Sequence, residues 1–540
     1  MNLPLPMLRK LFPLSLLLLC AALPAQAMEK WIYVQKNLLL DKSVDELDQL
    51  MQRGQAAGYD HLLLADSKSG RLAEMDQRYF HNVDRVKQLA AKYHIEIVPA
   101  LFPIGYSNEI LGRDVNLIEA LPVKNVPLTV QGGVAHVDDP DAPKLPADFS
   151  DWKKWGYHDQ NLVAENGNAK AVDPKGNSRI SLKLKVQPWR QYHVSVRIKT
   201  QDFHGSPEIK ALADRQLSWE NLGVKHTRDW TLHHAVFNSE GNSVITLYFG
   251  VWGAGPGTIE WSEPKIEEIA FMNMPRRPGC PLTVTRAEGG QPLTEGRDFE
   301  PLKDPVMGQK PWTGEYDTYH EPAVLHTKLP DGTKLLASFY NAQTVYDHQA
   351  MICPSEPKTV ELLRDQAVRM HKLWGAKGYM MSHDEIRVLD WCEACQKRKL
   401  TPGQILADNV RQCIQILKQV NPGGRIYTWS DMFDPNHNAV KGPYYLVNGS
   451  LEGSWEGLDK DVIVLDWYYE KRAESIKFFA DRGNKQVIAG YYDSNPAKIA
   501  DWLEAAKQAP GAVLGVMYTT WANNYRDLET FSKAADAAGK

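Results

Sequence analysis

The sequence predicts an α/β fold, a (β/α)8 TIM-type barrel with an inserted all-β jelly-roll sandwich. Strand and helix patterns alternate at both ends of the chain, which is typical of a parallel sheet. Between them, residues 127–271 alternate apolar and polar positions at period two, which indicates antiparallel strands. A chain of 540 residues is also too long for one ordinary domain.

Eight short apolar runs supply the strands that the barrel needs. They lie at 31–35, 61–66, 95–101, 378–382, 425–430, 462–467, 486–492 and 513–519. A ninth run at 335–340 is a rival fourth strand, but we assign it to a hairpin around Pro330, Asp331 and Gly332. Helix signals lie between most strands, including capping boxes at Ser43–Glu46 and Thr401–Gln404 and a long helix at 357–374.

These patterns divide the chain into five parts. Residues 1–27 form a signal peptide, with Arg9 and Lys10 before an apolar run and a small-residue cleavage site at Ala25 and Ala27. The barrel occupies 28–125 and 346–540, the sandwich 126–275, and a connecting region 276–345. We therefore expect a periplasmic or secreted protein that is free of the membrane after cleavage.

Composition limits the partners. The net charge is −4 and no block of like charge occurs, so neither nucleic acid nor a membrane surface is an expected partner. The 16 tryptophans favour an oligosaccharide or polysaccharide, because sugar faces stack on aromatic rings. The sequence does not indicate the oligomeric state.

Five cysteines follow the predicted cleavage site: Cys280, Cys353, Cys392, Cys395 and Cys413. An odd number does not fit a disulfide scaffold. Cys392 and Cys395 form a CxxC pair, which we interpret as a local disulfide or two buried thiols. A bound metal is the alternative, but no second pair stands at metal-like spacing. We predict no cofactor and no metal.

The tripeptide His383-Asp384-Glu385 closes an apolar strand and is the strongest functional signal. Charges at the end of a buried strand are costly unless they serve a purpose, and the carboxyl ends of barrel strands form the active-site floor. A pair of carboxylates there suits a glycosidase, which needs an acid for the leaving oxygen. Glu385, with the longer side chain, is the expected acid.

Other polar and aromatic residues follow the remaining strands and should line the same site. They are Asp66, Trp429, Asp431, Trp467, Tyr491, Tyr492, Asp493, Trp521 and Asn523, which with His383 we predict to bind substrate. No phosphate loop, GxSxG elbow or HExxH helix is present, which disfavours phosphoryl transfer, serine hydrolysis and zinc proteolysis.

The layout of the Asp384-Glu385 strand resembles glycoside hydrolase family 20, the β-N-acetylhexosaminidases. The resemblance implies that Asp384 orients the substrate's 2-acetamido group, which acts as nucleophile, and that Glu385 is the acid/base. It places Tyr491, Tyr492 and Asp493 after the seventh strand, and Trp429, Trp467 and Trp521 in the pocket wall. The sandwich resembles jelly-roll carbohydrate-binding modules through Tyr192–Val196 and Gly257–Trp261; it could bind sugar or only brace the barrel.

Two alternatives stay open. One is a two-carboxylate glycosidase with Glu385 as acid and Asp493 as nucleophile. The other is a non-catalytic glycan-binding protein. At the residue level, Asp384 and Glu385 could instead form a structural ion pair with Arg387, and Asp493 could cap a helix.

Overall fold

The computed structural model describes residues 28–346 and 348–539. The predicted signal peptide and its cleavage site lie outside the described residues. Within those residues, no helix is both long and apolar enough to cross a membrane.

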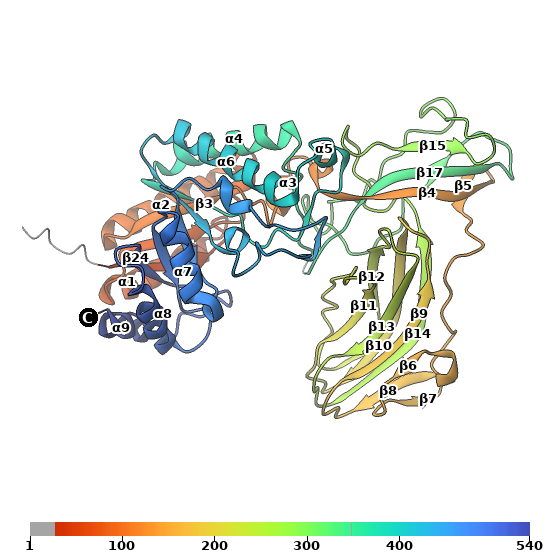
Figure 1. Cartoon of the computed structure of the whole chain (residues 1–540), viewed down its shortest axis with the longest axis horizontal. Helices are drawn as coiled ribbons and strands as arrows, with labels where there is room; N and C mark the ends of the chain where they lie inside the picture. Colours follow the sequence, from red (N-terminus) through yellow and green to blue (C-terminus); the bar gives the residue numbers. More distant parts are fainter. Residues whose placement is uncertain (1–27, 347, 540) are drawn as a thin grey trace, which may run out of the picture.

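Eight parallel strands close into a barrel, as predicted (Figure 1). Each strand pairs in register with its two neighbours, and β1 closes the ring against β24. The strands are β1 (Glu29–Gln35), β2 (His61–Ala65), β3 (Glu96–Leu101), β18 (Gly378–Met381), β20 (Arg425–Trp429), β22 (Ile463–Asp466), β23 (Gln486–Ala489) and β24 (Val513–Tyr518). Large buried side chains such as Trp31, Met380 and Tyr427 fill the interior, which is therefore a packed core with its site at one end.

Helices surround the barrel in Figure 1. The main ones are α1 (Asp41–Ala56), α2 (Gln77–Tyr93), α4 (Pro357–Trp374), α6 (Pro402–Val420), α7 (Arg472–Asp481), α8 (Ile499–Ala506) and α9 (Leu528–Ala538), with short turns α3 (Asn108–Leu111) and α5 (Glu393–Gln396) near the site. The capping box of Thr401 and Gln404 opens α6 as predicted. The one predicted at Ser43 is wrong, because α1 begins earlier, at Asp41. Asp41 provides the acidic group that favours a helix N-terminus and holds Asn82 of α2.

The inserted sandwich consists of two antiparallel sheets. One has the order β12 (Arg228–Asn238), β10 (Gln191–Gln201), β14 (Thr258–Ile269), β8 (Asn168–Val172), β7 (Val163–Glu165); the other has β11 (Pro207–Leu212), β13 (Val244–Val251), β9 (Ser178–Lys185), β6 (Tyr157–His158). Trp155 and Trp261 lie in its core. Among the described tryptophans only Trp312 is largely exposed, so most of the Trp content packs inside the protein or against other parts of it.

A third sheet joins the sandwich to the barrel and was not predicted as a unit. Its order is β15 (Thr283–Arg286), β17 (Lys334–Ala342), β4 (Ala120–Gln131), β5 (Val134–Val137), β16 (Leu325–His326). The run 335–340 therefore lies outside the barrel, as expected, but it forms no hairpin with the strand before it. It pairs with β4 and β15 instead, because Leu335, Ala337 and Phe339 bury their side chains in a separate apolar core.

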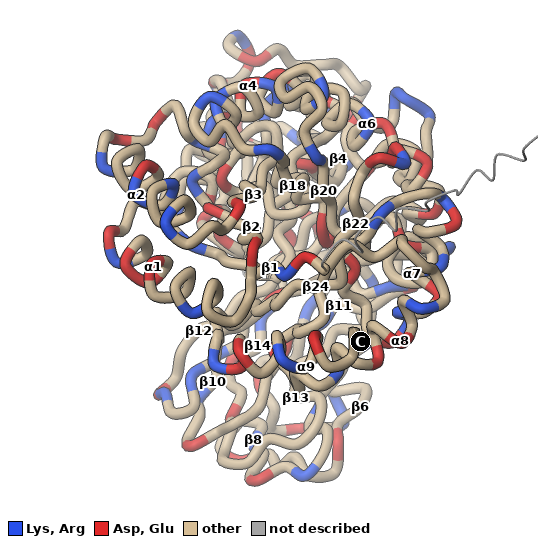
Figure 2. Tube along the Cα trace, turned by 90° about the vertical axis from the view of Figure 1, so that its left-hand side faces the viewer, with Lys and Arg blue, Asp and Glu red and all other residues tan. Residues whose placement is uncertain are grey.

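Charged residues of both signs are interspersed along the chain (Figure 2). The barrel helices carry many acid–base pairs between neighbours, such as Arg53 with Glu529 and Lys418 with Asp459. Such a pattern suits a solvated outer surface.

Candidate active site

A cavity of about 1090 Å³ opens at the carboxyl ends of the barrel strands. Side chains at or just after the ends of β1, β2, β3, β18, β20, β22, β23 and β24 line it, together with Glu315, Tyr346 and Gln349 from the chain between the sandwich and α4. Seven of the twelve predicted site residues line it: Asp66, Asp384, Glu385, Trp429, Trp467, Tyr492 and Trp521. The end of the barrel that was predicted to hold the site therefore holds the polar cavity.

Three carboxyl groups lie close together, Asp384 and Glu385 at the floor and Asp431 beneath it. Asp431, wholly buried after β20, accepts a hydrogen bond from the backbone N–H of Glu385 at 3.0 Å. Burial raises the pKa of Asp431 to about 7. Burial, with Asp431 and Glu385 nearby, also raises the pKa of Asp384 well above its ordinary value. The cluster therefore holds a proton near neutral pH.

Glu385 takes an unusual backbone conformation, with φ +46°. Its carboxylate pairs with Arg387 at 2.7 Å and accepts a hydrogen bond from the Tyr106 hydroxyl. Gln349 donates to its backbone carbonyl at 3.0 Å. A strained backbone held by this many contacts is typical of a site whose geometry matters. The ion pair that was an alternative reading therefore exists, and it involves Glu385.

Gly105 lets the loop after β3 approach the acidic pair. A Cβ at this position would lie 1.6 Å from the carbonyl oxygen of Asp384. Ile104 also donates to the carbonyl of Ser382 at 3.1 Å. These contacts hold the loop that carries Tyr106 against the carboxylates.

Aromatic rings form the walls. Tyr33 packs edge-on to both Trp429 and Trp521, with ring centres 5.5 and 5.0 Å apart. Trp467 lies parallel to Tyr492 at 5.5 Å, with an angle of 1° between the rings. Trp521 also leaves its indole N–H without a protein partner. Flat apolar surfaces beside carboxylates suit a sugar ring, whose C–H face stacks while its hydroxyls need polar partners.

Asp66 lies across the cavity at the end of β2. It accepts hydrogen bonds from the Tyr79 hydroxyl at 2.7 Å and from the backbone of Lys68 at 3.0 Å. Burial nevertheless raises its pKa to about 6. Its carboxyl is thus fixed in place and available as a partner for substrate hydroxyls.

The other predicted site residues do not line the cavity. His383 points toward α6, where its ring bonds Asn409 at 3.0 Å, and burial lowers its pKa to about 4. Tyr491 is buried and bonds Asp527. Asp493 accepts bonds from Thr520 and from the backbone of Trp521 and Ala522, so it organises the loop after β24. Asn523 is exposed on that loop, and Asp431 lies beneath the floor.

Tyr106, which follows the third strand and was expected to face a ligand, lines the cavity. Several other lining residues were not predicted: Tyr33, Gln35, Glu315, Tyr346, Gln349 and Arg387. Arg387 stands near a recognised strand end, so proximity to that end is a signal for it. Tyr346 and Gln349 lie between β17 and α4, and no local pattern in the sequence links that segment to the barrel mouth.

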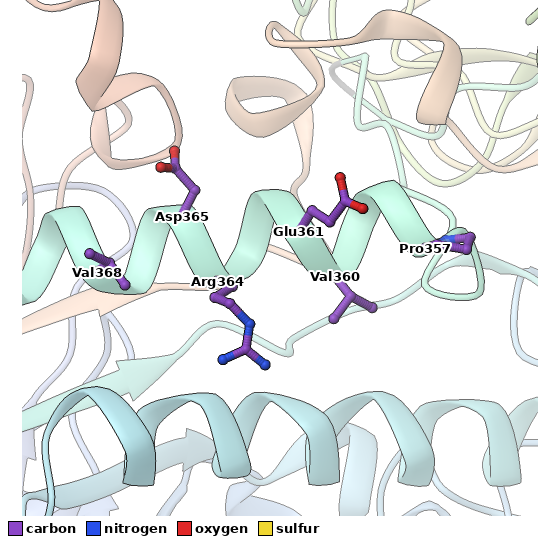
Figure 3. Close-up of a pocket in the computed structure, with 6 residues that line it drawn as sticks. All are labelled: Pro357, Val360, Glu361, Arg364, Asp365 and Val368. Atoms are coloured by element: carbon purple, nitrogen blue, oxygen red, sulfur yellow. The ribbon is translucent and has the colours of Figure 1, made fainter.

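A second hollow lies on the outer side of α4 (Figure 3). Its lining comes from that helix alone, including Val360, Arg364 and Val368. Arg364 turns toward α6 and bonds Gln419 at 2.6 Å. Of its charged residues, Asp365 also has partners, Arg113 and Arg369, so the hollow shows no arrangement for chemistry.

No known family model matches the chain, and no curated protein matches it. Among solved structures, the chain is similar to a β-N-acetylhexosaminidase from Bacteroides fragilis, with 8% identity, coverage of 95% of this chain and 66% of the other, and a TM-score of 0.40. It is also similar to a rhamnosidase from Novosphingobium, with 10% identity, coverage of 95% of this chain and 58% of the other, and a TM-score of 0.33. A structure described as CBM4 is 17% identical over 24% of this chain and 90% of its own, with a TM-score of 0.17. These likenesses carry no argument about function, which rests on the geometry of the cavity.

Proposed function

We propose that the protein is a glycoside hydrolase that cleaves an N-acetylhexosaminide, or a related glycan, with retention and with help from the substrate. The observation that carries the proposal is the pair Asp384 and Glu385 at the floor of a cavity walled by Trp429, Trp467 and Trp521. A carboxyl pair supplies proton transfer, and the aromatic walls supply a surface for a sugar ring.

In this mechanism, Glu385 donates a proton to the glycosidic oxygen while the acetamido oxygen of the substrate attacks the anomeric carbon. The bond to the leaving group breaks and a cyclic oxazolinium forms. Asp384 accepts a hydrogen bond from the N–H of the acetamido group and stabilises the positive charge that develops on that group. Glu385 then removes a proton from water, which opens the ring and returns the enzyme to its starting state.

The proton held by the cluster fits these roles. In the free site, burial and neighbouring carboxylates favour the protonated form of Asp384. A bound acetamido N–H donor favours the ionised form instead. The proton then becomes available to the adjacent Glu385, which needs it for the first step.

A two-carboxylate mechanism with Asp493 as nucleophile is less well supported. The Asp493 side chain accepts three hydrogen bonds from the loop after β24 and does not line the cavity. It would have to leave these partners to reach an anomeric carbon.

One observation favours a second candidate, a glycan-binding protein without turnover. The carboxylate of Glu385 is engaged by Arg387 and by Tyr106. A carboxylate committed to these partners would hold the site in shape without acting as an acid.

We also propose that the protein is exported, as the N-terminal pattern predicts.

Hydrolysis of paired fluorogenic glycosides tests the proposal. Each N-acetylhexosaminide is compared with its plain hexoside, using the wild type and the variants Asp384→Asn and Glu385→Gln. Turnover confined to acetamido sugars, with each variant at least about 100-fold slower, is the expected result. Glu385→Gln should lose more on a poor leaving group than on an aryl one, since the poor one depends more on the acid, whereas both need Glu385 as base in the second step. The exposed Glu361→Gln on α4 is the control and should match the wild type.

Other outcomes separate the alternatives. Turnover of plain hexosides would move the chemistry to a second carboxylate. Glycan binding without any product, in the folded protein, would favour the binding role.

A further inference from the structure

Four buried groups from distant parts of the sequence meet outside the cavity. The Sγ atoms of Cys353, Cys392 and Cys395 and a carboxylate oxygen of Glu119 all lie within 4.8 Å of one another. The four residues are at most 1% exposed, and none of the three cysteines is in a disulfide. Of the two interpretations of Cys392 and Cys395, the structure supports two buried thiols and not a disulfide. It also places Cys353 and Glu119 beside them, which was not predicted.

Four of the six distances among these atoms are close to those of a tetrahedron. The Sγ of Cys353 lies 3.4 Å from that of Cys392 and 3.7 Å from that of Cys395. The Oε2 of Glu119 lies 3.5 and 3.7 Å from the same two sulfurs of the CxxC pair. Zinc bonds of about 2.3 Å to sulfur and about 2.0 Å to oxygen place tetrahedral S···S pairs about 3.8 Å and S···O pairs about 3.5 Å apart.

The surroundings prepare Glu119 as a ligand. Its Oε1 accepts backbone N–H bonds from Trp391 at 2.8 Å and from Cys392 at 2.9 Å, which turns Oε2 toward the sulfurs. Outer contacts of this kind orient metal ligands. The buried Arg277 guanidinium pairs with Glu356, and its positive charge also acts on Cys353, Cys392 and Glu119.

Without an ion, this arrangement is hard to explain energetically. A buried carboxylate that faces three thiols has only weak donors on that side, and a desolvated charge needs a strong partner. A divalent cation would satisfy all four groups at once.

We propose that Glu119, Cys353, Cys392 and Cys395 bind one zinc ion in a closed, structural site. Four protein ligands leave no open position for substrate, so the ion would act on folding and not on the reaction. Cys280 contacts Cys392 but not the whole set, and we place it next to the ligands, not among them.

The location gives the ion a purpose. Cys392 and Cys395 flank the start of α5, shortly after the Asp384-Glu385 loop, whereas Glu119 precedes β4 of the third sheet and Cys353 precedes α4. One ion would therefore tie the loop beyond the active-site carboxylates to both the third sheet and the helix layer.

Metal analysis of the full chain tests the site. Protein purified without metal-affinity chromatography should contain about one zinc ion per chain by mass spectrometry of the elements. The zinc content should fall well below one ion per chain in each of four variants: Cys353→Ser, Cys392→Ser, Cys395→Ser and Glu119→Gln. It should stay near one in Cys280→Ser and in Cys413→Ser, because neither cysteine belongs to the set of four ligands. Retention by Glu119→Gln with loss in Cys280→Ser would overturn the assignment of Glu119.

A second measurement covers variants that fail to fold. Wild-type protein depleted by a chelator and refilled with Co²⁺ should show the near-ultraviolet charge-transfer band of cobalt thiolates, and Zn²⁺ should raise its Tm. Metal-free protein with all five described thiols titratable, a disulfide in the intact mass, or another metal at full occupancy would contradict the proposal.

Discussion

At the scale of single residues, the site depends on three carboxyl groups that lie close together at the end of the barrel. Asp431 is buried and Asp384 is half-buried, and the nearby Asp431 disfavours the ionisation of Asp384. Glu385 is linked to Asp431 through its backbone N–H and to Arg387 through its carboxylate. The same crowding that makes proton transfer possible also makes the protein sensitive to pH.

Asp431 should make stability fall as pH rises. Its pKa is about 7 in the folded protein, above the ordinary value of 3.8. Between these values the folded state binds a proton that the unfolded state has released, so the free energy of unfolding decreases as pH increases through that window. Asp431→Asn removes this contribution and keeps an oxygen for the Glu385 N–H. As the pH rises from about 5 to about 8, the Tm of this variant should fall less than the Tm of the wild type.

Thermal melts across that range check this prediction. The exposed Asp84→Asn variant serves as control and should keep the wild-type difference. An Asp431→Asn difference as large as that of the wild type would show that Asp431 does not hold the proton.

At the scale of elements, the barrel strands were predictable because each combines an apolar run with turn signals. The strand before Asp384 and the helices α4 and α6 follow the sequence patterns closely. Side-chain direction at strand ends was harder to predict. His383 turns outward to Asn409 while Asp384 turns inward, and only packing against α6 decides this. Asp493 was predicted as a site residue, but its carboxylate accepts hydrogen bonds from the backbone N–H groups of the loop after β24.

Gly105→Ala should impair activity through the loop after β3. An added methyl group would collide with the backbone of Asp384, so either the loop or the acidic pair must move. A displacement of about 1 Å at reacting groups costs about 100-fold in rate. Steady-state kinetics should show this fall mainly in kcat, with the far-ultraviolet circular dichroism unchanged.

Gly176→Ala is the matched control, because nothing lies within 4 Å of the added methyl group. It should leave activity unchanged. Full activity in Gly105→Ala would mean that the loop and the carboxylates are not coupled.

At the scale of the whole molecule, the added sheets pack against the end of the barrel that holds the cavity. Trp219 of the sandwich region contacts Tyr346 and Tyr445, and both tyrosines lie near Arg387. This contact supports a bracing role for the sandwich. The third sheet could not be predicted, because its strands come from both sides of the sandwich in the sequence and meet only after folding.

Arg215 is one polar link between sandwich and barrel, beside the backbone hydrogen bond from Tyr346 to Trp219. It donates to the backbone carbonyls of Tyr445 and Val447 and pairs with the buried Glu240 at 2.8 Å. Arg215→Met leaves that carboxylate without its partner and should reduce the free energy of unfolding by about 3–5 kcal/mol. The double variant Arg215→Met/Glu240→Leu should lose less, since no buried charge is stranded. Urea denaturation measures both, and equal losses would contradict a buried ion pair at this interface.

Substrate assistance is the central claim, and a series of N-acyl substrates tests it most directly. Aryl glycosides carrying N-acetyl, N-fluoroacetyl, N-difluoroacetyl and N-trifluoroacetyl groups differ little in shape, but each fluorine weakens the acyl oxygen as a nucleophile. If that oxygen attacks the anomeric carbon, log kcat/KM should fall steeply and steadily along the series. A flat series, with every member turned over at a similar rate, would show that the nucleophile belongs to the protein and would contradict substrate assistance and the role given to Asp384.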